Sequence, residues 1–504
     1  MYGGYPNNLQ KPSGSGIYIG AQELVFVSIL CVIGLTLYIS LYNSTSAPLV
    51  LLTVPLVLYD RAFMYPMFMT IALSQGAFSD TATSGVGTAD ASYSESLTIA
   101  SVAPILAWDL LTQKSKIVPF RFAIIYLFFI IFIYIGIFIY YQHPENFAGL
   151  PSGTGRGSPA VHSIVKSIKV VFYLFFLRVL INYPVALNYK ITEYTRRCMP
   201  FIIFPLGCYL LFNGRIQNGA GYSGTLQLGD AHHGTFTSTL CALTIYVFVT
   251  LFSRKPGIST FTRFFAFGAI VMVGIMIMMM GSRNGLLSFM ILCALGVYIH
   301  LVRRKIDFQF IIVLVCFIGG VIAIILSLNS PTLERAIYMT DEDGGGDRTY
   351  YWEAGAHALS TSPVFGMGGD ETASISAVAR YAPSMVEDRV MHNTYLEVAV
   401  EYGLIAAVLY IAFVWFTLKW SFRLYKLALD RQDLQLAAPG LSFLIMMIAA
   451  LFVSNIWDTG IWYTVSIIFA LAIQIVYPKY MDRRRINTTL SFDQLVSQAR
   501  IGRL

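Results

Sequence analysis

The chain has 504 residues, of which 56% are hydrophobic and only 12% are charged. Soluble domains carry about twice this share of charged residues, so the composition indicates a chain solvated by lipid. A backbone inside hydrocarbon must satisfy its own hydrogen bonds, which leaves helices or a closed barrel. Continuous apolar tracts such as Phe122–Tyr141 exclude the alternating strands of a barrel and predict an all-α polytopic membrane protein.

The predicted elements begin after a polar stretch, residues 1–20, which lacks the order of a cleavable signal peptide. Apolar tracts then predict about fourteen transmembrane segments. The second and third are short and are separated by Asp60 and Arg61, so they could instead form a re-entrant pair. The segments are Ala21–Tyr42, Pro48–Tyr59, Ala62–Leu73, Leu97–Leu111, Phe122–Tyr141, Val170–Leu187, Met199–Phe212, Phe236–Phe252, Phe264–Met280, Leu286–Val302, Phe310–Leu328, Leu404–Trp420, Leu441–Val453 and Ile461–Val476.

Basic residues gather in alternate connections between these segments, which is the positive-inside pattern of membrane proteins. The net charge of +7 therefore reflects topology, and we expect no nucleic-acid partner. Both termini are expected in the cytoplasm, and the longest outer loop is expected to be functional. The predicted organisation is a polar segment at 1–20, eleven helices within 21–328, a long outer loop with short helices at 329–403, three helices within 404–477, and a basic cytoplasmic tail at 478–504.

The arginines on the predicted outer side are exceptions to the positive-inside pattern. Any one of them could simply extend to lipid headgroups. Arg283 is the strongest candidate for function, because it lies in a five-residue turn between two apolar helices. Guanidinium groups suit phosphates, since their planar fork donates two charge-assisted hydrogen bonds. The outward arginines are Arg215, Arg283, Arg335, Arg348, Arg380 and Arg389.

The long outer loop contains two polar motifs. The stretch from Asp347 to Glu353 predicts a surface helix, followed by a turn at Ser362–Gly369. His392 is the best candidate for a general base, because the pKa of histidine lies near working pH, although a structural or capping histidine is the alternative. Glu397 could orient or replace it, or could only complement the helix dipole.

Other polar clusters are weaker candidates. Asp230, His232 and His233 offer metal-ligand types, but their spacing matches no known metal motif, so we expect no metal site and no cofactor. The acidic run from Asp341 to Asp347 lacks the closing glutamate of a calcium loop and is interpreted as a hinge.

Taken together, these motifs resemble the bacterial O-antigen ligase and polymerase family. The resemblance covers roughly residues 214–420 and rests on the order of four pieces. They are Gly214-Arg215 before a Gly-rich loop, the turn Gly281–Gly285, the stretch from Arg348 through Trp352 to Pro363–Gly368, and His392–Glu397 leading to Glu401-Tyr402-Gly403-Leu404. The segment after Arg215 departs from the family pattern, because it is long and carries two histidines.

The resemblance implies a glycosyltransferase C type fold in the bacterial inner membrane, with the active site facing the periplasm. It implies an undecaprenyl-pyrophosphate-linked glycan donor, no required metal, and an inverting single displacement. By position, Arg215 and Arg283 would bind the pyrophosphate, Arg348 would assist, and His392 would be the base.

The activities within this family differ in the acceptor molecule that receives the glycan. A polymerase extends another lipid-linked glycan, a ligase uses lipid A core, and a protein oligosaccharyltransferase uses a hydroxyl side chain. The number of segments and the long outer loop favour a polysaccharide polymerase, for which a chain-length regulator is a further expected partner. A lipid-linked glycan transporter and an assembly scaffold are the alternatives from other classes, although no paired halves with broken helices are evident.

Overall fold

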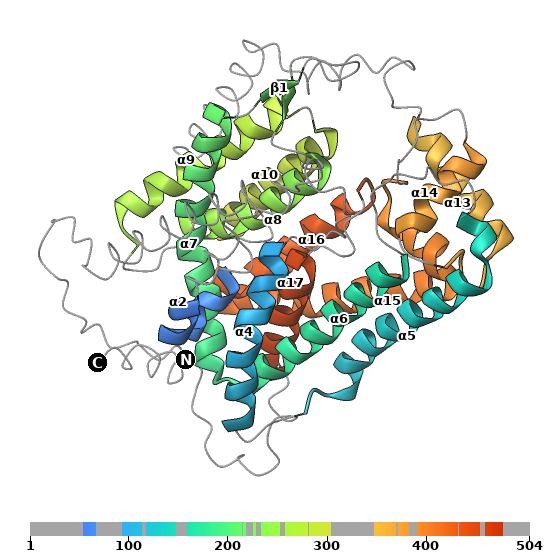
Figure 1. Ribbon diagram of the computed structural model, residues 1–504. Coiled ribbons are helices and arrows are strands. Elements are labelled where there is room, and N and C mark those ends of the chain that lie inside the picture. Colours follow the sequence, from blue (N-terminus) through green and yellow to red (C-terminus); the bar gives the residue numbers. More distant parts are fainter. Residues whose placement is uncertain are drawn as a thin grey trace, which may run out of the picture.

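The chain folds into a bundle of helices that pack around a central, fully buried helix (Figure 1). This computed structural model describes residues 54–66, 93–112, 117–147, 159–213, 215–217, 225–227, 233–252, 258–280, 282–303, 347–368, 371–382, 391–431, 433–453 and 459–476. The long α-helices are α4 (Tyr93–Thr112), α5 (Phe120–Gln142), α6 (Pro159–Asn182), α7 (Val185–Asn213), α8 (His233–Phe252), α9 (Thr260–Met279), α10 (Arg283–Arg303), α13 (Asp347–Thr361), α14 (Glu371–Tyr381), α15 (Thr394–Asp430), α16 (Ala438–Ala449) and α17 (Thr459–Leu471).

Several short elements join these helices. They are α2 (Val54–Tyr59), the 3-10 helices η2 (Arg61–Phe63), η3 (Pro144–Phe147) and η4 (Leu434–Leu436), the π-helix η5 (Ala472–Val476), and the strands β1 (Arg215–Gln217) and β2 (Thr225–Gln227). The two strands pair antiparallel, with Arg215 opposite Gln227. The sequence predicted an irregular outer loop there, so the all-α expectation misses one small hairpin.

Within the described residues, three helices are long and apolar enough to cross a membrane: α5, α9 and α15. A fourth span is possible if Lys166–Asn182 and Val185–Cys208, which meet at 117°, count as one broken span. The fold is therefore that of a helical membrane protein, but the expected count of fourteen spans is not confirmed. Hydropathy cannot separate a span from a shorter helix buried within the bundle, such as α8 or α17. The expected segments Ala21–Tyr42 and Phe310–Leu328 lie outside the described residues.

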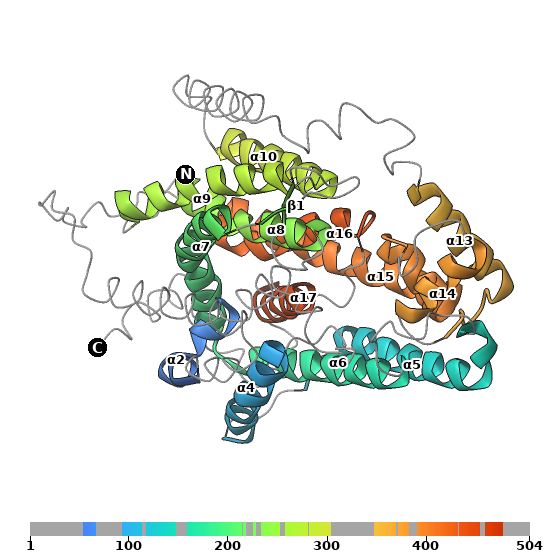
Figure 2. The same cartoon turned by 45° about the horizontal axis from the view of Figure 1, so that its top comes forward.

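The core is built on α17, which Figure 2 shows end-on between α6, α15 and α16. Trp462 of this helix is 1% exposed. Its indole stacks on Tyr173 of α6 and on Phe413 of α15, each with ring centroids 5.6 Å apart. Because large aromatic surfaces contribute most of the burial energy, this stack holds α6, α15 and α17 together.

The break between α6 and α7 falls at Pro184, whose ring disfavours helical backbone at the preceding residue. It falls inside the predicted segment Val170–Leu187, which is therefore not one straight helix. The carbonyls freed by the break are buried, and the Gln474 side chain donates to those of Leu180, Ile181 and Tyr183 at 2.8 to 3.2 Å. The break is thus a stable feature, because its backbone groups are satisfied.

The charges at the second and third predicted segments are paired with other helices. Arg61 donates to Asp109 of α4 at 2.6 Å. Asp60 accepts from Lys190 of α7 at 2.5 Å and also caps η2 through the N–H of Ala62. Both charges therefore fix this short helical turn against α4 and α7.

Candidate functional site

Helices α13 and α14 and the start of α15 form a small unit at one end of the bundle, beside the end of α5 (Figures 1 and 2). Its core contains Tyr351, Ala354, Met367, Ala377 and Val400. These residues come from all three helices and from the turn after α13. The expected surface helix and turn in the long loop are therefore present, and they pack as one body with the first turns of α15.

Residues 391–394, here called the His392 segment, are hydrogen-bonded to both α13 and α14. The indole N–H of Trp352 donates to the carbonyl of Met391 at 3.2 Å, and the N–H of Met391 donates to the Oγ of Ser374 at 3.0 Å. His392 follows directly, with φ +51°, and is the only non-glycine residue with positive φ in the described part of the chain. Such backbone costs about 1–3 kcal/mol and persists at sites that constrain it.

The imidazole of His392 is half-buried and lies edge-on to Tyr351, with ring centroids 6.4 Å apart. The next residue, Asn393, caps α15, because its Oδ1 accepts from the N–H groups of Tyr395 and Leu396 at 3.1 Å each. The backbone of His392 is thus fixed between a buried residue and a helix cap, which restricts the positions that its imidazole can take.

Two carboxylates follow His392 on successive turns of α15. Glu397 and Glu401 are each 2% exposed. Residues four apart share a face of a helix, so the two side chains emerge on the same side of α15. Buried carboxylates are costly and therefore mark positions with a structural or chemical role.

The sequence predicted a helix beginning near Leu404, whereas α15 begins ten residues earlier at Thr394 and is interrupted at Gly403. At this break the turn after α13 docks on the helix through backbone hydrogen bonds. Met367 donates to Val400 at 2.7 Å, Gly368 donates to Glu401 at 3.1 Å, and Leu404 donates to Pro363 at 2.8 Å. The turn Pro363–Gly368 thus satisfies the backbone groups that the break frees.

Arg348, near the start of α13, reaches toward the segment that follows α16. Its guanidinium carbon lies 5.9 Å from the ring centroid of Phe452. Thr394 contacts the same segment, since its N–H donates to Ala450 at 2.9 Å and its hydroxyl donates to Val453 at 2.6 Å. Arg348 and the His392 segment are therefore both tied to residues 450–453.

Arg283 is the first residue of α10 and is half-exposed. The preceding Ser282 accepts from the N–H of Gly285 at 3.0 Å and lies 3.0 Å from the hydroxyl of Thr237 in α8. A cation at a helix N-terminus is disfavoured by the helix dipole, whereas an anion there is favoured. A bound anion at this end of α10 would therefore reduce the unfavourable interaction between the charge of Arg283 and the helix dipole.

Helix α10 packs against α8 and α16, and the residues after α16 contact Arg348 and Thr394. Helix α16 therefore connects the element that carries Arg283 with the unit that carries His392 and Glu397. For Arg215 the structure describes only the backbone, at the start of β1.

Some candidates lie outside the described residues: Asp230, His232, Arg335, Arg389 and the acidic run 341–346. Among the residues that are described, no three His, Cys, Asp or Glu side chains gather in a way that could hold a metal ion. Sequence reasoning missed the contribution of Gly403 and of the turn Pro363–Gly368. The glycines and proline in these two motifs were visible, but their contact joins residues about forty positions apart.

The fold and these residues define a helical membrane protein in which guanidinium, imidazole and carboxylate side chains are carried by one connected group of helices. A family model described as O-Antigen ligase matches residues 267–411, a stretch that contains Arg283, Arg348, His392 and Glu397. Over these residues the chain is similar to the O-antigen ligase family, in agreement with the resemblance that its motifs indicate. No curated protein matches the chain.

Proposed function

We propose that this protein is a polysaccharide polymerase that transfers an undecaprenyl-pyrophosphate-linked glycan to an acceptor at the outer face of the bacterial inner membrane. One observation carries the proposal. The stretch matched by the family model contains both a guanidinium at a helix N-terminus, Arg283, and a conformationally fixed histidine followed by a buried carboxylate, His392 and Glu397.

The proposed reaction is a single displacement. A hydroxyl oxygen of the acceptor attacks the anomeric carbon of the donor glycan, while the bond from that carbon to the pyrophosphate oxygen breaks. His392 accepts the hydroxyl proton, and the bonding electrons leave with undecaprenyl pyrophosphate. Attack from the opposite side inverts the configuration at the anomeric carbon.

Negative charge grows on the departing pyrophosphate during this step. Guanidinium groups fixed in advance stabilise that charge without reorganisation, which is the most effective form of electrostatic catalysis. Arg283 is proposed to hold the pyrophosphate, with Arg348 and Arg215 as further contacts. Glu397 is proposed to orient His392 and to stabilise its protonated form, because a nearby carboxylate favours the imidazolium.

The test is an assay of the purified protein with a defined lipid-pyrophosphate-linked oligosaccharide and no ion gradient. Two acceptors are compared: a second lipid-linked unit and lipid A core. Extension of the lipid-linked unit supports a polymerase, whereas transfer only to lipid A core identifies a ligase. Movement of the donor across the bilayer without transfer would identify a transporter and refute the proposal.

Variants assign the residues within the same assay. Arg283→Ala and His392→Ala are each expected to abolish transfer while the protein remains folded. Arg380→Ala is the matched control, because Arg380 is an exposed arginine at the end of α14 and has no proposed role. Full activity of the Arg283 and His392 variants would refute the site.

A further inference from the structure

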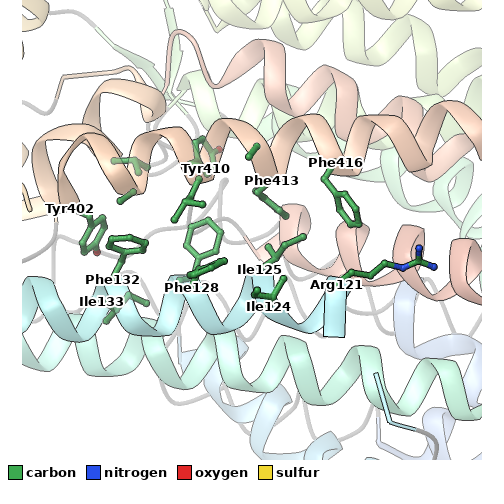
Figure 3. A pocket seen from close by; sticks show the side chains of 15 residues that line it. Arg121, Ile124, Ile125, Phe128, Phe132, Ile133, Tyr402, Tyr410, Phe413 and Phe416 are labelled. Atoms are coloured by element: carbon green, nitrogen blue, oxygen red, sulfur yellow. The ribbon is translucent and has the colours of Figure 1, made fainter. Parts of the chain in front are cut away.

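A narrow groove runs between α5 and α15, and it forms a cavity of about 210 Å³. Figure 3 shows side chains from the two helices facing one another across it, with Tyr402 near one end and Arg121 at the other. Phe132 of α5 lies beside Tyr402 at one end, and Phe128 of α5 and Tyr410 and Phe413 of α15 line the middle. The lining is apolar along its whole length apart from the tyrosine hydroxyls and the single guanidinium.

The groove has the surroundings and length of a site for one alkyl chain. Both helices are candidate membrane spans, and only 22% of the most apolar window of α5 is buried within the protein. Helix α15 lines the groove from Val398 to Phe416, and the part after the break at Gly403, from Ala406 to Phe416, is about 15 Å long at 1.5 Å per residue. One half of a bilayer's hydrocarbon core is roughly 15 Å thick, so the groove accommodates an extended chain from one leaflet.

A cationic cluster lies at the end of the groove farthest from α13 and α14. The guanidinium carbon of Arg121 lies 5.6 Å from the ring centroid of Trp420, and that of Arg423 lies 4.6 Å from the same ring. Both guanidinium groups therefore flank one tryptophan ring, and each can donate charge-assisted hydrogen bonds to a phosphate. By the positive-inside rule this end faces the cytoplasm, where tryptophan and arginine are typical of the lipid headgroup level.

We propose that this groove binds an anionic phospholipid of the cytoplasmic leaflet, with one acyl chain between α5 and α15 and the phosphate at Arg121 and Arg423. The isoprenoid chain of a glycan donor fits less well. Its pyrophosphate would lie at the outer face, at the opposite end of the groove from both guanidinium groups. The inference is independent of glycan transfer.

The experiment is native mass spectrometry of the purified full chain after addition of dioleoyl phosphatidylglycerol or dioleoyl phosphatidylcholine. The wild-type protein is expected to retain phosphatidylglycerol preferentially. Arg121→Gln is expected to lower this retention about tenfold, since charge-assisted hydrogen bonds to phosphate are lost. Lys426→Gln is the matched control, because Lys426 is an exposed cation of α15, three residues after Arg423, that lies over Phe422 and does not line the groove.

A second variant tests the acyl-chain site separately. Ala412 lines the groove from an exposed position, so Ala412→Phe is expected to fill the groove without disturbing the core and to lower retention as well. Wild-type retention in Arg121→Gln or in Ala412→Phe would overturn the proposal. So would equal retention of the two lipids, an equal loss in Lys426→Gln, or displacement of the phospholipid by an isoprenyl diphosphate.

Discussion

Gly403 controls the docking of the turn Pro363–Gly368 on α15, and its substitution is the sharpest structural perturbation available. The residue has φ +86° and ψ 173°, a region that is essentially restricted to glycine. A Cβ atom at this position would lie 2.0 Å from the carbonyl oxygen of Val364. Gly403→Ala must therefore either change the helix break or push the turn away.

The cost of this change follows from the contacts that would be lost. Three backbone hydrogen bonds join the turn to α15, at 2.7, 2.8 and 3.1 Å. Each contributes about 1 kcal/mol net. Keeping the backbone unchanged would instead cost about 1–3 kcal/mol in strain, before the clash is counted. We expect the docked state to lose roughly 3 kcal/mol, which corresponds to about a hundredfold rise in the population of the undocked state.

Hydrogen exchange measures this population directly, because the amides of Met367 and Gly368 are protected by the lost bonds. Peptides that cover residues 363–368 should exchange about a hundredfold faster in Gly403→Ala. Gly274→Ala is the control, since Gly274 lies in the helical backbone of α9 and its Cβ would meet only the side chain of Phe289 at 3.2 Å. Unchanged exchange at 363–368 in Gly403→Ala would refute the docking account.

Substitutions at three further residues test how the site and the α6–α7 break are held, each by thermal unfolding in detergent. Asn393→Ala removes the cap of α15 and should cost about 1 kcal/mol, whereas Asn393→Asp should retain most of the stability. Trp352→Phe removes the hydrogen bond to the carbonyl of Met391 and should also cost about 1 kcal/mol. Gln474→Leu removes the side-chain donor to the carbonyls of Ile181 and Tyr183 at the α6–α7 break, whereas the carbonyl of Leu180 keeps Asn188 as a donor at 2.7 Å. It should cost more, about 2–3 kcal/mol, and a smaller loss than in Trp352→Phe would contradict this account of the break.

Local sequence signals predicted those features that depend on local chemistry. The helical membrane fold followed from continuous apolar tracts, and the helix and turn in the long outer loop followed from residues 347–369. The polar motifs around His392 and Arg283 were recognisable because charged groups are unusual beside apolar helices.

Features that depend on distant contacts were not predictable in the same way. The interruption of α15 at Gly403 is defined by Val364, and the break before α7 is satisfied by Gln474, almost three hundred residues from Leu180. Hydropathy alone also does not decide which of the shorter apolar helices cross the membrane, because a helix enclosed by others is as apolar as one enclosed by lipid.

The central claim is that Arg283 binds the donor pyrophosphate while His392 removes the acceptor proton. Measuring both donor affinity and transfer rate in Arg283→Ala and His392→Ala tests this division of roles most directly. We predict that Arg283→Ala weakens donor binding and abolishes transfer. His392→Ala should bind the donor as the wild type does but transfer it about 10² to 10⁴ times more slowly. Wild-type donor affinity in Arg283→Ala, or wild-type transfer in His392→Ala, would contradict the account.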